Sequence, residues 1–419
     1  MNHYSNSLTV APTPTNIEGE RAWTATGSSG ALSGIRVLDL SRVLAGPYAT
    51  QMLADHGASV LKIESPDGDE TRAWGPPFVR EGTSAYYEGL NRSKDNICLN
   101  LRTEEGREVL WHLIAGADVV VENFKSGTMP KWGFDFETRL RPKFPNLVYC
   151  SVTGFGSGGP LGGEPGYDAV LQSFGGLMSV NGYADGLPLR VGVPIVDITA
   201  GNLAFSGILL ALLERERRGE GQLVDITLLD AVASLLHPHS SNWIHGGQTP
   251  QRTGDAHPSV VPYQIFNAAD GDLFISAAND RQFTKLMTLL EAPELATDEL
   301  YATNSARSEN RDSLIQLLSK LILKWDRTVL SKRLTEVGVA SSPVNTVDQA
   351  LSSAQATHRG LIIDNEDYKG VGVPIKLQRT PGPRPRRVQD KGESTLQVLG
   401  AMGYDHAAVQ RLQCAGALG

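Results

Sequence analysis

Short stretches rich in β-branched residues alternate with helical periodicity along the first half of the chain. Residues 34–41, GIRVLDLS, predict a strand. Residues 46–57, GPYATQMLADHG, predict a helix, with Pro47 in its first turn and Gly57 at its end. Further strands are expected at 58–64, 95–101, 118–124 and 146–152, and a helix at 103–117 with Thr103 as its N-cap. This alternation predicts a parallel sheet with right-handed crossovers, hence a Rossmann-like α/β domain from about residue 33 to 200.

The second half of the chain has a different pattern. A long apolar helix is expected over 200–222, ending in a basic turn at Gly219. Residues 260–278 predict a β-hairpin with Asp270-Gly271 as its turn, and helical patterns fill 280–338. We therefore expect a large domain over 33–225, completed by about 345–419, and a smaller α+β domain over 226–344. The polar residues 1–32 are expected to form a flexible tail.

Composition narrows the classes of function. The 419 residues are 41% hydrophobic and 20% charged, which is ordinary for a globular enzyme. The net charge of −8 argues against a nucleic-acid partner or a membrane surface, and no uninterrupted apolar run approaches the roughly 20 residues of a membrane span. The three cysteines are far apart, so no metal site is expected, and a reducing, cytoplasmic location is favoured.

One carboxylate occurs in unusual surroundings. Asp197 lies in GVPIVDITAG, residues 192–201, where the other residues are apolar or small. An Asp before an apolar helix is a preferred N-cap, and the local sequence favours that role. A chemical role is the alternative, in which the small residues Gly192, Ala200 and Gly201 would allow close approach of a substrate. A dinucleotide site is not expected, because the first strand runs into SRVLAGP and not into GxGxxG.

Six stretches, in order, resemble CoA-transferase family III, the group that contains formyl-CoA transferase and carnitine CoA-transferase. They are GIRVLDLSRVLAGPYATQMLADHGASVLKIE, GDETRAWGPPF, NRSKDNICLNL, ADVVVENFKSGTMPKWG, GYDAVLQSFGG and VPIVDITAG. The stretches TRAWGPPF, SAYYEGLNRSK and AHPSVVPYQIF resemble the branch that acts on dicarboxylates, which includes succinyl-CoA:glutarate and itaconate CoA-transferases. The resemblance covers nearly the whole chain after the tail.

The resemblance implies that Asp197 is the nucleophile. Its carboxylate would attack the donor thioester to give an aspartyl–acyl anhydride, which CoA thiolate converts into an aspartyl-CoA thioester. The acceptor acid then takes the CoA. A carboxylate becomes a useful nucleophile when it is desolvated and aligned, and an anhydride must be shielded from water. An Asp in apolar surroundings fits both requirements.

Two neighbouring residues bear on a rival function. The family carries an acidic residue at the position of Asp168, where the alternative role is an N-cap of the next helix. The α-methylacyl-CoA racemases share the fold and have a His before that Asp, where this chain has Tyr167. Tyrosine is a poor base at neutral pH, so we favour a transferase over a racemase.

The resemblance also assigns binding residues. Val43, Leu44 and Ala45 match the family's CoA contacts in the first strand-to-helix loop. Other CoA contact positions correspond to Leu99, Arg102, Asn123, Phe124 and Lys131. A dicarboxylate needs a cation for its second charge. The candidates are Arg72, which could also serve CoA, with Arg252 and His257, and Arg42 less favoured.

The resemblance implies an enzyme that moves CoA from succinyl-CoA to a small dicarboxylate such as itaconate or glutarate. CoA thioesters would be its substrates, and no permanently bound cofactor or metal is implied. The resemblance implies an interlocked homodimer. The alternatives are a 2-methylacyl-CoA racemase of the same fold and a CoA-binding protein without turnover.

Overall fold

The computed structural model describes residues 29–419, so most of the expected N-terminal tail lies outside the described residues. The chain divides into two compact units. The first contains the described residues up to 171 together with 193–235 and 361–419, and the second contains 172–192 and 236–360. Residues 172–192, expected in the large domain, belong to the second unit, and the main segment of that unit is 236–360 and not the expected 226–344. Each unit is described by itself.

The first unit is built on a six-stranded, fully parallel sheet with the order β5-β2-β1-β6-β7-β8. Its strands are β1 (Arg36–Asp39), β2 (Ser59–Glu64), β5 (Asp95–Cys98), β6 (Val119–Glu122), β7 (Val148–Thr153) and β8 (Leu223–Thr227). The chain leaves β1 toward β2 and later returns to β6 on the other side of β1. The gap between β1 and β6 is therefore a topological switch point, where open α/β sheets bind ligands at the carboxyl ends of the strands.

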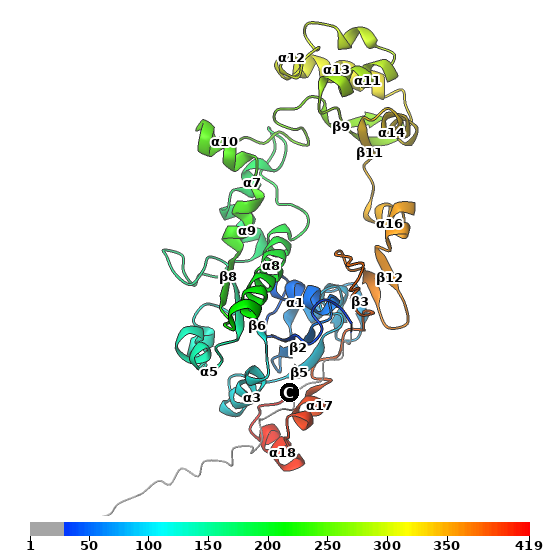
Figure 1. The fold of residues 1–419 in the computed structure, drawn as a ribbon. Coiled ribbons are helices and arrows are strands. Elements are labelled where there is room, and N and C mark those ends of the chain that lie inside the picture. The colour runs from blue at the N-terminus through cyan, green and yellow to red at the C-terminus, as the bar shows by residue number, and fades with distance from the viewer. Residues whose placement is uncertain (1–28) are drawn as a thin grey trace, which may run out of the picture. The chain divides into compact units, whose positions relative to one another are not determined.

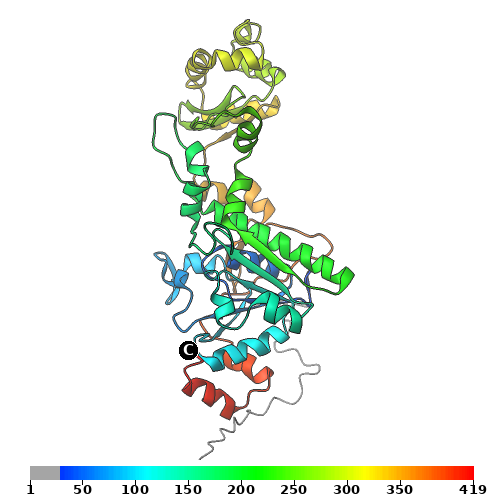
Figure 2. The ribbon, with the colours of Figure 1, turned by 90° about the vertical axis from the view of Figure 1, so that its left-hand side faces the viewer.

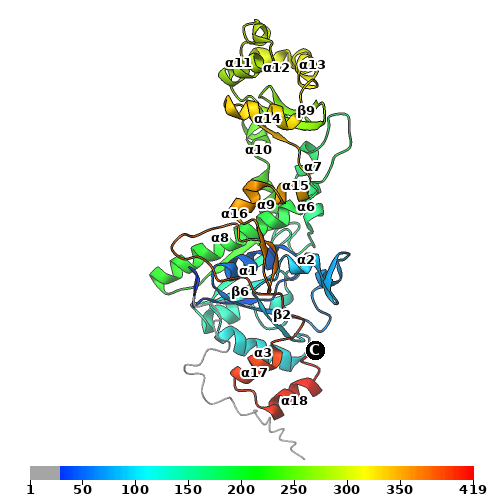
Figure 3. The same ribbon diagram turned by 90° about the vertical axis from the view of Figure 1, so that its right-hand side faces the viewer.

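Helices cover both faces of this sheet (Figures 1 and 2). On one face α1 (Ala45–Asp55) packs against α8 (Ile195–Arg218). On the other, α3 (Glu104–Ala115), α17 (Thr395–Ala401) and α18 (His406–Cys414) share a core with the sheet, and Figure 3 shows these three helices next to one another. The predicted α/β class with a parallel sheet is confirmed.

Local signals set several helix ends as expected. Thr103 caps α3 by accepting a hydrogen bond from the backbone N–H of Gly106. Gly219 ends α8 with φ +79°, a conformation that favours glycine. However, α8 begins at Ile195, about five residues before the predicted start, which places Asp197 inside its first turn. By length and apolar composition α8 resembles a membrane span, but it is partly buried, as core helices of soluble proteins also are.

Shorter elements complete the first unit. They are η1 (Glu70–Ala73), β3 (Phe78–Arg80), β4 (Thr83–Ser84), α2 (Ala85–Glu88), α4 (Thr128–Lys131), η2 (Phe136–Leu140), α5 (Arg141–Lys143), α9 (Leu228–Leu235), β12 (Ile362–Asp364) and β13 (Lys369–Val371). The helix α6 (Asp168–Phe174) begins in this unit.

The second unit has an antiparallel sheet of order β11-β10-β9, formed by β9 (Tyr263–Ala268), β10 (Gly271–Ser276) and β11 (Ala340–Pro343). The predicted hairpin is confirmed, but its turn is Ala269-Asp270 and not Asp270-Gly271, because Gly271 already pairs with Ala268 as the first residue of β10. Its core joins the sheet to α11 (Asp280–Leu289), α13 (Arg311–Ile322) and α14 (Arg327–Glu336). Its other helices are α7 (Leu177–Val180), α10 (His239–Gly246), η3 (Pro293–Ala296), α12 (Asn304–Glu309), α15 (Val347–Leu351) and α16 (Ala354–Arg359).

Candidate active site

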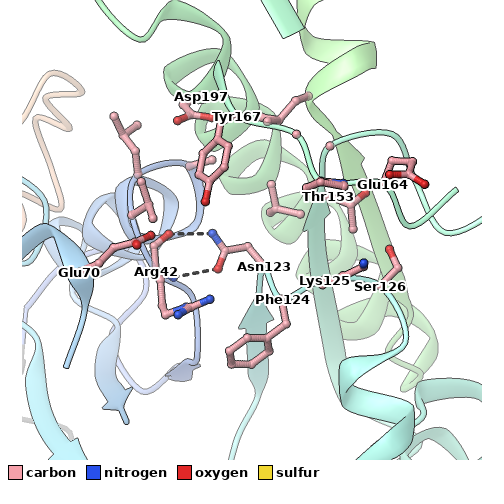
Figure 4. A pocket seen from close by; sticks show the side chains of 18 residues that line it. Arg42, Glu70, Asn123, Phe124, Lys125, Ser126, Thr153, Glu164, Tyr167 and Asp197 are labelled. Atoms are coloured by element: carbon pink, nitrogen blue, oxygen red, sulfur yellow. Dashed lines mark hydrogen bonds between the residues drawn. The ribbon is translucent and has the colours of Figure 1, made fainter. Parts of the chain in front are cut away.

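A pocket of about 220 Å³ lies in the first unit at the switch point of the sheet (Figure 4). Three loops at the carboxyl ends of strands form most of it: residues 42–45 after β1, 123–126 after β6, and 152–154 at the end of β7. Residues 164–167, the first turn of α8, Glu70 and Leu228 contribute the rest. The position is the one at which a parallel sheet of this order binds ligands.

Two of these loops are joined directly. The backbone N–H of Arg42 donates to Asn123 Oδ1 at 2.8 Å, and Asn123 Nδ2 donates to the Arg42 carbonyl oxygen at 2.7 Å. Figure 4 shows this pair below Tyr167 and Asp197. The guanidinium of Arg42 lies 5.8 Å from the ring centroid of Phe124. The amide side chain thus fixes the distance between the β1 and β6 loops.

Asp197 is the third residue of α8 and lines the pocket. Pro194 stands at the N-cap position and gives the helix no side-chain hydrogen bond. Instead, Asp168 Oδ1 accepts from the backbone N–H groups of Val196 at 2.8 Å and Asp197 at 3.2 Å. The prediction that Asp197 is an N-cap is therefore wrong. Asp168 was predicted as a possible cap of its own helix. Its side chain instead accepts from N–H groups in the first turn of α8, although Asp168 precedes Asp197 by 29 residues in the sequence.

Gly201 brings α8 close to the first loop. A Cβ at this position would lie 2.8 Å from the Ala45 carbonyl oxygen and 3.0 Å from Tyr48 Cδ1. A side chain would force α8 away from α1. Gly201 was expected to make room for substrate. It makes room for α1 instead, and so keeps Asp197 beside the loop of residues 42–45.

The surroundings of Asp197 favour its neutral form. Burial and the nearby carboxylate of Asp168 raise the pKa of Asp197 from 3.8 to about 7. The N-terminal end of α8 favours a negative charge there, but the two opposing effects dominate. Asp197 is therefore poised to change protonation near neutral pH, and its ionised form is poorly solvated, as a reactive carboxylate requires.

This pair yields a prediction for Asp168→Asn. The amide oxygen can still accept the two α8 hydrogen bonds, but the negative charge is lost, so the pKa of Asp197 falls. If ionised Asp197 is required, wild-type kcat/KM for an acyl-CoA falls as pH drops through about 7. In Asp168→Asn this acid limb moves to lower pH. The exposed substitution Asp312→Asn should leave it in place. An unmoved limb in Asp168→Asn would contradict the coupling.

The structure brings many of the sequence-predicted residues together. Those that line the pocket are Val43, Leu44, Ala45, Asn123, Phe124, Tyr167 and Asp197. Leu99 is fully buried in the core of the sheet and its helices, so its side chain is not part of the pocket lining. Arg102 and Lys131 are exposed cations outside the lining. Their proposed contacts with CoA stay predictions.

Arg72 has a partner within its own unit. Its guanidinium makes two hydrogen bonds to Glu64, at 2.9 and 2.8 Å, and lies 3.9 Å from the ring centroid of Tyr87. The Arg72 side chain is only 11% exposed. Its charge is therefore already neutralised by Glu64 and it does not line the pocket.

The other two candidate cations belong to the second unit. The Arg252 guanidinium donates to the carbonyl oxygens of Tyr183 at 3.1 Å and Gly186 at 2.9 Å, which closes the loop between them. The ring nitrogen Nδ1 of His257 accepts from the backbone N–H of Ser259 at 3.1 Å. A role for either residue in holding a substrate carboxylate stays a prediction.

Sequence reasoning missed five polar residues of the pocket lining: Glu70, Lys125, Ser126, Thr153 and Glu164. Lys125 and Ser126 directly follow the predicted Asn123 and Phe124, so their place after a parallel strand was a usable signal. Glu70 and Glu164 come from an irregular connection and a glycine-rich loop, where no periodicity indicates which side chains point inward.

An α/β protein with a partly buried carboxylate at the switch point of its sheet is the class that this fold and pocket define. A model of CoA-transferase family III matches residues 32–393. The succinate–glutarate CoA-transferase of Agrobacterium fabrum is 42% identical over 379 residues, which cover 88% of this chain and 94% of the relative. The succinyl-CoA:mesaconate CoA-transferase of Haloarcula hispanica is 39% identical over 374 residues, 84% of this chain and 92% of the relative.

A solved structure extends the similarity to the fold. The crystal structure of a CaiB/BaiF family protein from Brucella suis has a TM-score of 0.82 and 41% identity, and the match covers 89% of this chain and all of the other. The protein belongs to CoA-transferase family III and is a CoA-transferase enzyme. The resemblance seen in the six motifs is confirmed, and the racemase and non-catalytic alternatives find no support in these relatives.

Proposed function

We propose that the enzyme transfers CoA from succinyl-CoA to a small dicarboxylate such as glutarate or itaconate. The observation that carries the proposal is a poorly solvated carboxylate, Asp197, in the pocket of a chain whose relatives are named for transfer to glutarate and mesaconate. Both of those acceptors are dicarboxylates. Acyl-CoA and carboxylic acid substrates follow from the family itself.

In the proposed mechanism no water or external cofactor is consumed. Ionised Asp197 attacks the carbonyl carbon of succinyl-CoA and the C–S bond breaks. CoA departs as the thiolate, and the product on the enzyme is a succinyl–aspartyl anhydride. The thiolate attacks the Asp197 carbonyl carbon of the anhydride, which releases succinate and forms an aspartyl-CoA thioester. The acceptor carboxylate attacks that thioester, and the released thiolate then attacks the acceptor's acyl carbon. The products are the new acyl-CoA and the original Asp197 carboxylate.

The chain's own residues support these steps in three ways. Asp168 fixes the first turn of α8 that carries Asp197. The Arg42–Asn123 pair holds the two loops that would receive the CoA thioester. Arg42 and Lys125 supply positive charge in the lining, although Glu70 and Glu164 supply negative charge.

We also propose that the protein is a homodimer, in keeping with the exposed apolar side chains of Leu210 and Leu213 on α8. Light scattering would distinguish a homodimer from a monomer.

An acceptor series tests the proposal. With succinyl-CoA as donor, kcat/KM is measured for glutarate, itaconate and mesaconate, with butyrate as the monocarboxylate control. A second carboxylate paired with a cation should contribute about 1.5–3 kcal/mol, so dicarboxylates should be preferred by about one to two orders of magnitude. Equal rates for glutarate and butyrate would remove the dicarboxylate assignment.

The same substrate pair identifies the cation. Among Arg42→Ala, Arg252→Ala and His257→Ala, the responsible variant should lose activity with glutarate and keep it with butyrate. Arg72→Ala should impair both substrates alike, because it leaves Glu64 without its ion-pair partner in a buried network.

A further inference from the structure

The loop between β1 and α1 contains a strained residue. Val43 has φ +68°, in the left-handed region that β-branched residues avoid. Val43 lines the pocket together with Asp197. A conformation of this kind persists only where the surrounding structure enforces it, and such residues cluster at binding and catalytic sites.

A buried charge network, formed by Asp39, Lys62 and Lys94, is hydrogen-bonded to the chain just before Val43. Asp39 accepts hydrogen bonds from both the backbone N–H and the hydroxyl of Ser41. Lys62, from β2, donates to the Ser41 carbonyl oxygen at 2.8 Å. Ser41 is therefore held at its N–H, its side chain and its carbonyl group, two residues before the strained position.

The same network is hydrogen-bonded to the first turns of α1, just after the loop between β1 and α1. Lys94 Nζ donates to Asp39 Oδ2 at 2.9 Å and to the carbonyl oxygen of Pro47, in the first turn of α1, at 2.8 Å. Thr50, one turn further along α1, donates to the same Asp39 oxygen at 2.6 Å. Asp39 and Lys94 thus connect the segment before the loop to the helix after it.

These charges are expensive to bury and take no part in the proposed chemistry. The side chains of Asp39, Lys62 and Lys94 are at most 1% exposed, and none of them lines the pocket. Burial opposes ionisation of Asp39, but Lys94 and Lys62 outweigh it and lower its pKa to about 2. Burial lowers the pKa of Lys94 to about 8, so all three side chains are charged around pH 7 and Lys94 loses its charge at more alkaline pH. Buried ion pairs can often be replaced by apolar residues of similar volume without loss of stability, so stability alone does not account for the network.

We propose that Asp39, Lys62 and Lys94 are positioning residues that hold Val43 in its left-handed conformation, so that the loop is shaped for a CoA thioester before the ligand arrives. The inference rests on the proposed function in one respect, that CoA binds this pocket. A loop that is ordered before the ligand arrives loses less conformational entropy on binding, which increases the affinity without any new contact to the ligand.

A double-mutant cycle tests the inference. Lys62→Met removes the donor to Ser41, and Val43→Gly removes the strain, because glycine adopts positive φ freely. The dissociation constant for free CoA is measured by calorimetry with no acceptor acid present. In the wild-type background, Lys62→Met should raise the dissociation constant for CoA about tenfold, because the free energy of the released backbone strain corresponds to a change of about that size. In the Val43→Gly background the same substitution should weaken binding by less than about threefold.

Two further measurements guard against a trivial result. Ser41→Ala removes only the hydroxyl bond to Asp39 and leaves every charge in place, so it decides the question if Lys62→Met does not fold. Its effect on CoA binding should also shrink in the Val43→Gly background. In steady-state assays Lys62→Met should raise KM for succinyl-CoA more than it lowers kcat, which a general loss of folded protein would not do.

The outcomes separate this inference from the function. Equal losses of CoA affinity in the two backgrounds would overturn the positioning role and leave the proposed function intact. A wild-type protein that binds no CoA would overturn both. A protein that shows the coupling but prefers monocarboxylate acceptors would retain the positioning role and lose the dicarboxylate assignment.

Discussion

Asp197→Asn is expected to lower the rate of CoA transfer by about four orders of magnitude or more, the scale seen when a covalent nucleophile is removed. The amide has nearly the same shape, so α8 and its two hydrogen bonds to Asp168 remain. Only the reacting oxygen's charge and nucleophilicity are lost. The measurement is succinyl-CoA consumption with glutarate as acceptor.

The matched control is Asp312→Asn, which makes the same chemical change at an exposed position of α13 in the second unit. It should retain wild-type activity. CoA binding by Asp197→Asn, measured by calorimetry, should also persist, because the loops after β1 and β6 are unchanged. Transfer by Asp197→Asn at a near wild-type rate would exclude Asp197 as the nucleophile.

The same substitution is expected to stabilise the protein above neutral pH. In the unfolded chain Asp197 loses its proton near pH 3.8, whereas in the folded protein it keeps the proton up to about pH 7. Because the unfolded state binds fewer protons between these values, the free energy of unfolding falls as pH rises through this window. Above pH 7 the full penalty applies, up to about 4 kcal/mol at about 1.4 kcal/mol per pKa unit.

Asparagine cannot ionise, so Asp197→Asn avoids this penalty. Its melting temperature should exceed that of the wild type at pH 8, and the difference should shrink as the pH is lowered toward 4. Calorimetric scans of both proteins across this range measure the effect, with Asp312→Asn as the exposed control. A difference that is constant with pH, or wild-type protein that is the more stable at pH 8, would show that Asp197 is not destabilised by its surroundings.

Local patterns predicted much of the fold because the signals act over a few residues. The Thr103 cap, the end of α8 at Gly219 and the hairpin near residue 270 each depend on adjacent chain, and each is confirmed, although the turn lies one residue earlier than predicted. The parallel sheet follows from alternation of strands and helices. The strand β8 was not predicted, because its five residues lie at the edge of the sheet and are partly exposed.

The site was harder to predict because its geometry depends on contacts between distant segments. Asp168 was recognised as important, but its hydrogen bonds to α8 span 29 residues and no local pattern indicates them. The pairing of Arg72 with Glu64 removes a candidate cation that sequence alone left available. Likewise, the strain at Val43 and its hold by Lys62 appear only once β1 and β2 are side by side.

The central claim is that Asp197 carries CoA during transfer, and covalent trapping tests it most directly. Wild-type protein is incubated with succinyl-CoA without an acceptor acid, treated with hydroxylamine, digested and analysed by mass spectrometry. A hydroxamate at Asp197, dependent on succinyl-CoA and absent from Asp197→Asn, is the predicted result. Protein that completes CoA transfer while Asp197 stays unmodified, or that carries the hydroxamate on another carboxylate such as Glu164, would contradict the account.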